Sequence, residues 1–199
     1  TNKPKTKSMQ KKWHVKTLKD TTIVDAFRSK LKVDSIVAEL LLQRGIDSFD
    51  MAQDFFRPKL DQLHDPFLMK DMEAAVDRLQ EAIDEDQKVM LFGDYDVDGT
   101  TAVALMYSFL KDTLKVDYYI PDRYAECYGL SKQGIDVAKE HDVSLIICLD
   151  CGIKAVDKIA YAKSLGIDFI VCDHHMPGEE LPDAIVLDPK RKDCSYPYD

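Results

Sequence analysis

The chain has 199 residues, of which 45% are hydrophobic and 32% are charged. This length fits one or two globular domains with cores that need no disulfides, and the composition excludes a disordered chain. No uncharged apolar run approaches the ~18 residues of a membrane span, and the polar, lysine-rich start has no apolar stretch of a secretory signal. We therefore expect a cytoplasmic protein with no membrane contact, in which the five cysteines are reduced thiols.

The net charge of -9 is spread unevenly along the chain. Residues 1–32 carry ten Lys or Arg and two Asp or Glu, so the remainder holds a large acidic excess. Such an excess argues against nucleic-acid binding by overall charge. It can be solvated surface, or it can include carboxylates that divalent metal ions neutralise. The basic start could hold phosphates, although a solvated tail is the simpler interpretation.

The first predicted elements are short helices. In DSIVAELLLQRG, Asp34 or Ser35 caps a run of apolar residues and Gly45 ends it. The segment SFDMAQDFF predicts a second helix, capped by Ser48 and broken by the Arg-Pro pair that follows. We expect residues 1–70 to hold a basic tail, these helices and a connecting loop.

From residue 71 the pattern changes to alternating helices and strands. A helix over DMEAAVDRLQEAIDED places four apolar residues on one face: Met72, Val76, Leu79 and Ile83. The strands that follow are KVMLFGD, VDYYIP, SLIICLD, DFIVCD and AIVLDP. Helices of about a dozen residues separate the first four, which is typical of a parallel α/β sheet flanked by helices. The predicted fold is therefore α/β over residues 71–199, preceded by a small α-helical segment.

Acidic residues follow three of these strands, in GDYDVDG, LDCG and CDHH. Open parallel sheets bind ligands at the carboxyl ends of their strands. Several carboxylates at one edge repel each other, and a pair of divalent ions removes that repulsion. Carboxylates with imidazole and without a set of thiolates suit Mn²⁺ or Mg²⁺ better than Zn²⁺. The candidate residues are Asp94, Asp96, Asp98, Asp150, Asp173, His174 and His175.

Each of these motifs also has a structural interpretation. Acids after strands are often helix caps, and a pair of histidines is often surface or core. The DxDxDG string resembles the start of an EF-hand, but its twelfth position is Leu105 and it follows a strand. The CLDC string matches a redox motif, but Cys148 lies inside an apolar strand and is better explained as core. No phosphate-binding loop or serine elbow occurs. The presence of acids at three strand ends of one sheet favours the metal site.

The motifs GDYDVDGTTA, LDCG and DHH, in this order, resemble the DHH phosphoesterase superfamily. The stretches FFRPKLDQLHDPFLMKDMEAAVDRL, IPDRYAECYGLSKQGID and VCDHHMPGEELPDAIVLDPK resemble its RecJ-like exonucleases, and the similarity runs from about residue 34 to the end. The resemblance implies 5′→3′ hydrolysis of single-stranded DNA, with Mn²⁺ or Mg²⁺ as cofactor, in DNA repair and recombination. Single-stranded DNA is the implied partner, alongside other repair proteins.

The resemblance has two departures. Cys127 stands where RecJ-like proteins usually have glycine, which could alter a loop near the substrate. The sequence stops at Asp199, whereas the family continues into a fourth motif with a further metal-binding aspartate and into additional domains. We therefore expect this chain alone to be weakly active or inactive.

The resemblance also implies roles for the acids. Two ions would activate a water and stabilise the transition state at phosphorus. Asp150 is expected to bridge them, because it follows the central strand. Asp94 and Asp96 would complete the ligand set of one ion. Asp98 and His174 would contribute to the other.

The remaining site residues are expected to act on the substrate or on the ligands. His175 would contact the scissile phosphate or protonate the leaving oxygen, and Asp173 would orient a histidine. Arg123 could bind a DNA phosphate, with a surface ion pair as the alternative. Tyr128 could stack on a base, with core packing as the alternative. Gly152 opens a predicted helix whose free N–H groups could hold an anion.

Two other functions fit the sequence less well. A related DHH phosphodiesterase could act on short oligonucleotides or cyclic dinucleotides, and the RecJ-like stretches favour single-stranded DNA over these substrates. A non-catalytic DNA-binding module would have lost its metal ligands, whereas all the acids and both histidines remain here.

Overall fold

The computed structural model describes residues 12–14, 16, 21–126 and 128–197, so residues 1–11, 15, 17–20 and 198–199, together with Cys127, lie outside the described part. The chain forms two compact units that divide between Leu63 and His64, a few residues before the boundary expected at residue 70. The ring of His64 packs edge-on against Tyr196, with 5.9 Å between centroids. The loop that begins at His64 therefore belongs to the second unit.

The first unit is helical, as predicted. Its elements are α1 (Thr21–Leu31), α2 (Ser35–Gln43), α3 (Phe49–Phe56) and the 3-10 helix η1 (Leu60–Gln62). Asp34 caps α2 and Ser48 caps α3, each by accepting a backbone N–H. Helix α1 was not predicted, although its apolar residues recur at helical spacing. A small core holds the unit together: Val24, Phe27, Ala38, Leu41, Ile46 and Ala52.

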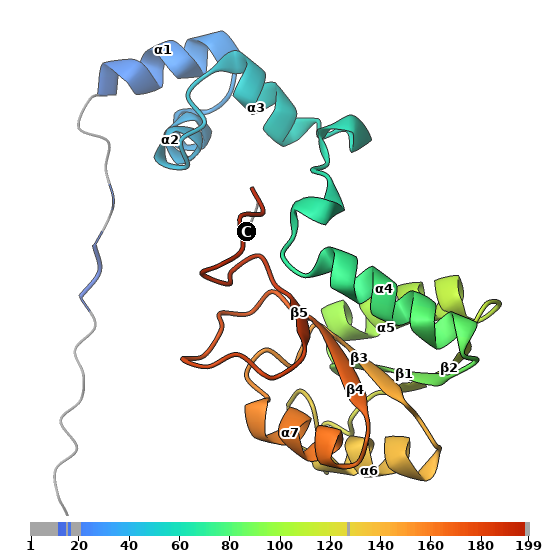
Figure 1. Cartoon of the computed structure of the whole chain (residues 1–199). Coiled ribbons are helices and arrows are strands. Elements are labelled where there is room, and N and C mark those ends of the chain that lie inside the picture. Colours follow the sequence, from blue (N-terminus) through green and yellow to red (C-terminus); the bar gives the residue numbers. More distant parts are fainter. Residues whose placement is uncertain (1–11, 15, 17–20, 127, 198–199) are drawn as a thin grey trace, which may run out of the picture. The chain divides into compact units, whose positions relative to one another are not determined.

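The second unit contains the predicted parallel sheet (Figure 1). Its strands are β1 (Lys88–Gly93), β2 (Lys115–Tyr119), β3 (Leu145–Leu149), β4 (Asp168–Cys172) and β5 (Ile185–Leu187). They lie in the order β2-β1-β3-β4-β5, and every neighbouring pair is parallel. β1 and β3 are apolar and almost wholly buried, as expected for strands covered on both faces.

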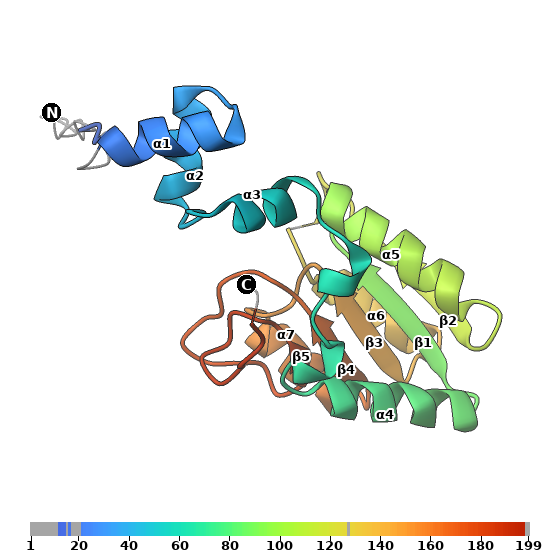
Figure 2. The ribbon, with the colours of Figure 1, turned by 90° about the horizontal axis from the view of Figure 1, so that it is seen from above.

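Helices cover both faces of this sheet. They are α4 (Met72–Asp84), α5 (Val97–Leu110), α6 (Lys132–Glu140) and α7 (Val156–Ser164), and the 3-10 helix η2 (Pro66–Leu68) precedes them. Alternate strand residues pack toward α4 and α5 on one face and toward α6 and α7 on the other. Figure 2 shows α5 running alongside β1 and β2. The predicted α/β class is confirmed.

The buried face of α4 differs slightly from the prediction. Val76 is 45% exposed, whereas Ala75 and Ala82 are buried against the sheet. Met72, Leu79 and Ile83 are partly buried beside them. Small alanines on this face let α4 approach the strands closely, so the larger Val76 lies at the edge of the contact.

Two further expectations concern the whole chain. Among the described residues, no helix has the length and apolar character needed to cross a bilayer. The four described cysteines, Cys148, Cys151, Cys172 and Cys194, form no disulfide with one another.

Candidate metal centre

The three central strands end in the predicted acids. Asp94 follows β1, Asp150 follows β3 and Asp173 follows β4. The strand order reverses direction between β1 and β3, and such a switch point is where open parallel sheets bind ligands. The three residues are only 0%, 9% and 7% exposed. Charges buried this deeply need partners.

Asp150 lies at the middle of the site. Its Oδ1 is 3.0 Å from Nε2 of His174, and the ligand atoms of Asp150, His174 and His175 all lie within 4.8 Å of one another. Asp150 has a left-handed backbone with φ 62, and its N–H donates to the carbonyl oxygen of Cys172 at 2.9 Å. This turn directs the carboxylate toward the two histidines. Burial raises the pKa of Asp150, as does the nearby charge of Asp96, while both histidines oppose the shift.

Asp173 fixes the geometry of both histidines. Its Oδ1 accepts the N–H of His174 at 2.7 Å and that of His175 at 3.1 Å, and it lies 2.7 Å from Nδ1 of His175. Its Oδ2 accepts the N–H of Ile153 at 2.9 Å. Burial alone would raise the pKa of Asp173, but these hydrogen bonds lower it overall. The bond to Asp173 is in turn the largest cause of the raised pKa of His175.

The acids after β1 lie around the start of α5. Oδ1 of Asp94 accepts the N–H of Tyr95 at 2.6 Å, and Oδ1 of Asp96 caps α5 by accepting the N–H of Gly99 at 3.0 Å. A side chain at Gly99 would place its Cβ 2.5 Å from the backbone N and O of Asp94, so only glycine lets α5 pack this closely. Asp98 is exposed in the first turn of α5, and it is not in the group of ligand atoms formed by Asp150, His174 and His175. Its role stays a prediction.

Two buried carboxylate oxygens at this edge of the sheet have no hydrogen-bond partner in the described part of the chain, and the one on Asp94, a predicted ligand, fits a cation. Among the described residues, Oδ2 of Asp94 and Oδ2 of Asp188 are the buried side-chain polar atoms that have no hydrogen-bond partner. An unsatisfied buried group costs about 1–3 kcal/mol, and a bound ion or donor removes that cost. Carboxylates and imidazoles without thiolates suit Mn²⁺ or Mg²⁺.

Asp188 was not among the predicted site residues. It follows β5 in AIVLDP, so the rule that selected the other strand-end acids would also have found it. It was not selected because it is a single acid before a proline, without the further acids or histidines that mark the other motifs.

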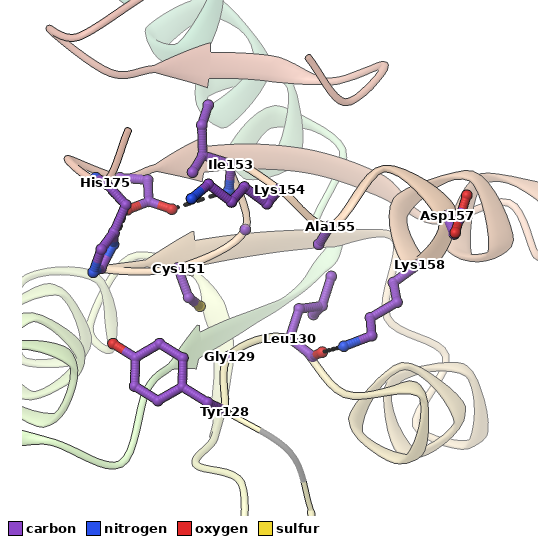
Figure 3. Close-up of a pocket in the computed structure, with 12 residues that line it drawn as sticks. Tyr128, Gly129, Leu130, Cys151, Ile153, Lys154, Ala155, Asp157, Lys158 and His175 are labelled. Carbon is purple, nitrogen blue, oxygen red and sulfur yellow. Dashed lines mark hydrogen bonds and ion pairs between the residues drawn. The ribbon is translucent and has the colours of Figure 1, made fainter. Parts of the chain in front are cut away.

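A cavity of about 380 Å³ adjoins His175 (Figure 3). The rings of Tyr128 and His175 lie at one side of it, and Lys158 lies at the other, where its Nζ donates to the carbonyl of Leu130 at 2.5 Å. Lys154 also lines the cavity, and its charge opposes protonation of His175. The cavity is therefore open to the histidine that is predicted to contact the substrate.

Gly152 lines this cavity but does not open a helix, so that part of the prediction is wrong. α7 begins at Val156, and a turn closed by the bond from the N–H of Ala155 to the Gly152 oxygen precedes it. The bond from Ile153 to Asp173 uses one of the N–H groups that the prediction assigned to an anion. Gly152 has φ 111, a conformation that favours glycine.

Three residues that are predicted to contact the substrate lie in one row together with the ring of Tyr95: Arg123, Tyr128 and His175. The guanidinium of Arg123 lies 5.2 Å from the ring centroid of Tyr95, which meets Tyr128 edge-on at 5.7 Å. Tyr128 meets His175 at 6.4 Å. Tyr128 is 52% exposed, which contradicts the core-packing alternative. Among the described residues Arg123 makes no ion pair, so it stacks on an aromatic ring instead.

Comparisons with known proteins agree with this architecture. The chain is 42% identical over 181 residues to the single-stranded-DNA-specific exonuclease RecJ of Bacillus subtilis, which covers 90% of this chain and 23% of that protein. It is 37% identical over 129 residues to the Escherichia coli protein of the same name, which covers 63% of this chain and 22% of the relative. The chain thus spans about a quarter of the length of these curated relatives.

Solved structures are similar as well. A crystal structure of RecJ from Thermus thermophilus in complex with Mn²⁺ matches with a TM-score of 0.65 and 25% identity, over 92% of this chain and 26% of that one. A crystal structure of exonuclease RecJ bound to manganese matches with a TM-score of 0.59 and 30% identity, over 63% of this chain and 32% of that one. The model of the DHH family, N-terminal domain, matches residues 88–196, which is more than half of the sequence. The chain therefore belongs to the DHH family.

Proposed function

We propose that this chain carries the metal centre of a hydrolase that removes nucleotides from the 5′ end of single-stranded DNA, in repair and recombination in the cytoplasm. The observation that carries the proposal is the cluster of Asp150, His174 and His175 at the switch point of the sheet. The similarity to single-stranded-DNA-specific exonucleases supports DNA as the substrate. Other repair proteins are proposed as partners by the same similarity.

We propose that Asp94, Asp96, Asp150 and His174 hold two divalent ions, with Asp98 as a further ligand. Mn²⁺ and Mg²⁺ are the proposed ions, because these residues offer oxygen and imidazole donors. Bound ions of this kind lower the pKa of a water and neutralise charge that develops on a phosphate. The free buried oxygen of Asp94 supports its place in this set.

The protein's own residues prepare this site. Asp173 binds Nδ1 of His175, which leaves Nε2 of that ring to face the substrate. The raised pKa of His175 lets it keep a proton closer to neutral pH, so it can give one to the leaving oxygen. We propose that Arg123 contacts a backbone phosphate, and that Tyr128 and Gly152 contact the nucleotide at the edge of the cavity.

An assay with 5′- and 3′-labelled single strands tests this proposal. In a full-length protein that contains this chain, we expect release of nucleotides from the 5′ end that requires Mn²⁺ and falls at least ~100-fold in Asp150→Asn, which keeps the turn but removes a charge from the centre. Asp183→Asn is the matched control, because this acid is exposed and pairs with Lys163 on the surface. Equal, Mn²⁺-dependent rates in Asp150→Asn and wild type would overturn the two-ion centre.

Two other outcomes would favour different functions. Hydrolysis of dinucleotides or cyclic dinucleotides without hydrolysis of longer strands would favour the related phosphodiesterases. Binding of single-stranded DNA with no uptake of Mn²⁺ would favour a non-catalytic DNA-binding module. Because the chain covers about a quarter of its curated relatives, Mn²⁺ binding should be measured together with turnover.

A further inference from the structure

Asp188 is a buried acid at the end of β5 that the proposed hydrolysis does not use. β4 and β5 pair with Cys172 opposite Leu187, and the N–H of Asp173 donates to the Leu187 oxygen at 3.0 Å. Asp188 is therefore level with Asp173 on the neighbouring strand. Its exposed fraction is 0%, so it lies at the same edge as the metal centre but beneath the surface.

The two oxygens of Asp188 have different surroundings. Oδ1 accepts the N–H of Lys190 at 2.7 Å, and the N–H of Arg191 donates to the backbone oxygen of Asp188 at 3.3 Å. These bonds form the turn that follows β5. Oδ2 has no partner among the described residues. Asparagine could form the same turn, so the turn does not explain why a second charged oxygen is buried here.

Three charged or titratable groups act on this carboxylate. Asp173 has like charge, but both of its oxygens already accept hydrogen bonds. Asp173 raises the pKa of Asp188, whereas Lys190 and His174 lower it. His174 directs Nε2 toward Asp150, and its Nδ1 makes no hydrogen bond within the described part of the chain. Because Asp188 is level with Asp173, the residue before His174, a buried acceptor with no donor among the described residues lies on the strand beside His174.

We infer that Asp188 is a positioning residue for His174, whose Nδ1–H it accepts when Nε2 binds a divalent ion. The inference rests on the metal centre proposed above. A histidine that binds a metal almost always donates its other ring N–H to a carboxylate, a carbonyl or a water. His175, which is not one of the proposed ligands, shows the same kind of pairing, because its Nδ1 lies 2.7 Å from Oδ1 of Asp173. Asp188 supplies the corresponding carboxylate for His174.

The test compares Mn²⁺ affinity in the 199-residue chain, measured from the paramagnetic resonance signal of free Mn²⁺. We expect Asp188→Asn to weaken binding ~10- to 100-fold, as is usual for the partners of metal-bound histidines. Asp183→Asn also removes one negative charge, but at an exposed position, and should change the affinity by less than about twofold. The unfolding temperature without metal should not fall in Asp188→Asn, because asparagine keeps the turn.

A second pair of variants separates positioning from direct binding. In a His174→Ala background, adding Asp188→Asn should cause no further loss, since the two side chains act as one unit. If Asp188→Asn lowers the Mn²⁺ affinity in that background as much as it does in the wild type, Asp188 binds the ion itself. That result would overturn the inference. Wild-type affinity in Asp188→Asn, with or without a lower unfolding temperature, would also overturn it. If the wild-type chain takes up no Mn²⁺, the proposed function fails first, and that result is distinct from the other two.

Discussion

The carboxylates at the ends of β4 and β1 are buried to a similar degree but are satisfied very differently. Asp173, after β4, accepts three backbone N–H groups and binds the ring of His175. Asp94, after β1, accepts one N–H and leaves a buried oxygen without a partner among the described residues. The β4 side is therefore fixed by the protein's own donors, whereas the β1 side keeps a buried carboxylate oxygen that a cation could bind. A site built in this way keeps its histidines in place before the ion arrives.

The largest expected effect comes from removing the satisfied carboxylate. Asp173→Ala leaves the N–H groups of Ile153, His174 and His175 without their acceptor, and each unsatisfied buried group costs about 1–3 kcal/mol. We expect the free energy of unfolding to fall by about 3 kcal/mol in denaturant titrations without metal. Asp183→Ala, on the exposed surface, should leave it unchanged. A loss no larger than in this control would mean that the donors find water or other acceptors.

The opposite change in the free energy of unfolding is expected when Asp94, the carboxylate with an unsatisfied oxygen, is replaced. Asp94→Asn removes the charge of a buried carboxylate whose Oδ2 lacks a partner among the described residues, so the metal-free chain should be more stable by about 1 kcal/mol. Saturating Mn²⁺ at about 100 times its Kd should stabilise the wild type by about 2.7 kcal/mol. The variant should gain much less, because a proposed ligand is lost. Thermal unfolding with and without Mn²⁺ measures both effects, and a destabilised metal-free variant would contradict the comparison.

The smallest expected effect is a pH dependence of the pair formed by Asp173 and His175. The pKa of Asp173 is lowered from 3.8, so its contribution to stability is present above that value and is lost as pH falls through the lowered pKa. The pKa of His175 is raised from 6.5, so its contribution is present below 6.5 and is lost as pH rises through the raised pKa. The stability difference between wild type and Asp173→Asn should therefore be largest between about pH 4 and 6.5. A difference that is constant from about pH 4 to 9 would show that the ion pair contributes nothing.

Much of the fold follows from local sequence patterns. The strands were predictable because apolar runs such as LIICL are buried on both faces, and Asp34, Ser48 and Ser131 mark helix starts by their capping side chains. The start of α7 was not predictable from such patterns. It depends on the bond from Ile153 to Asp173, which joins residues twenty positions apart and holds the chain in a turn until Val156.

The site was predictable to a similar extent. The rule that acids at the ends of parallel strands meet at one edge identified Asp94, Asp150 and the DHH motif. It did not show that Asp96 caps α5 or that Asp98 is exposed, because the orientation of side chains in the first turn of a helix depends on how that helix packs. Nor did it distinguish the satisfied carboxylate of Asp173 from the unsatisfied ones, which requires the three-dimensional positions of the donors.

The left-handed backbone of Asp150 has a consequence for mutational scanning of this protein. Residues with positive φ favour glycine and asparagine over alanine, and they disfavour β-branched side chains. A library selected for stability alone should therefore enrich Gly and Asn at position 150 and deplete Val and Ile. A library selected for metal-dependent function should retain Asp. The difference between the two rankings at this position would separate selection for folding from selection for the metal centre.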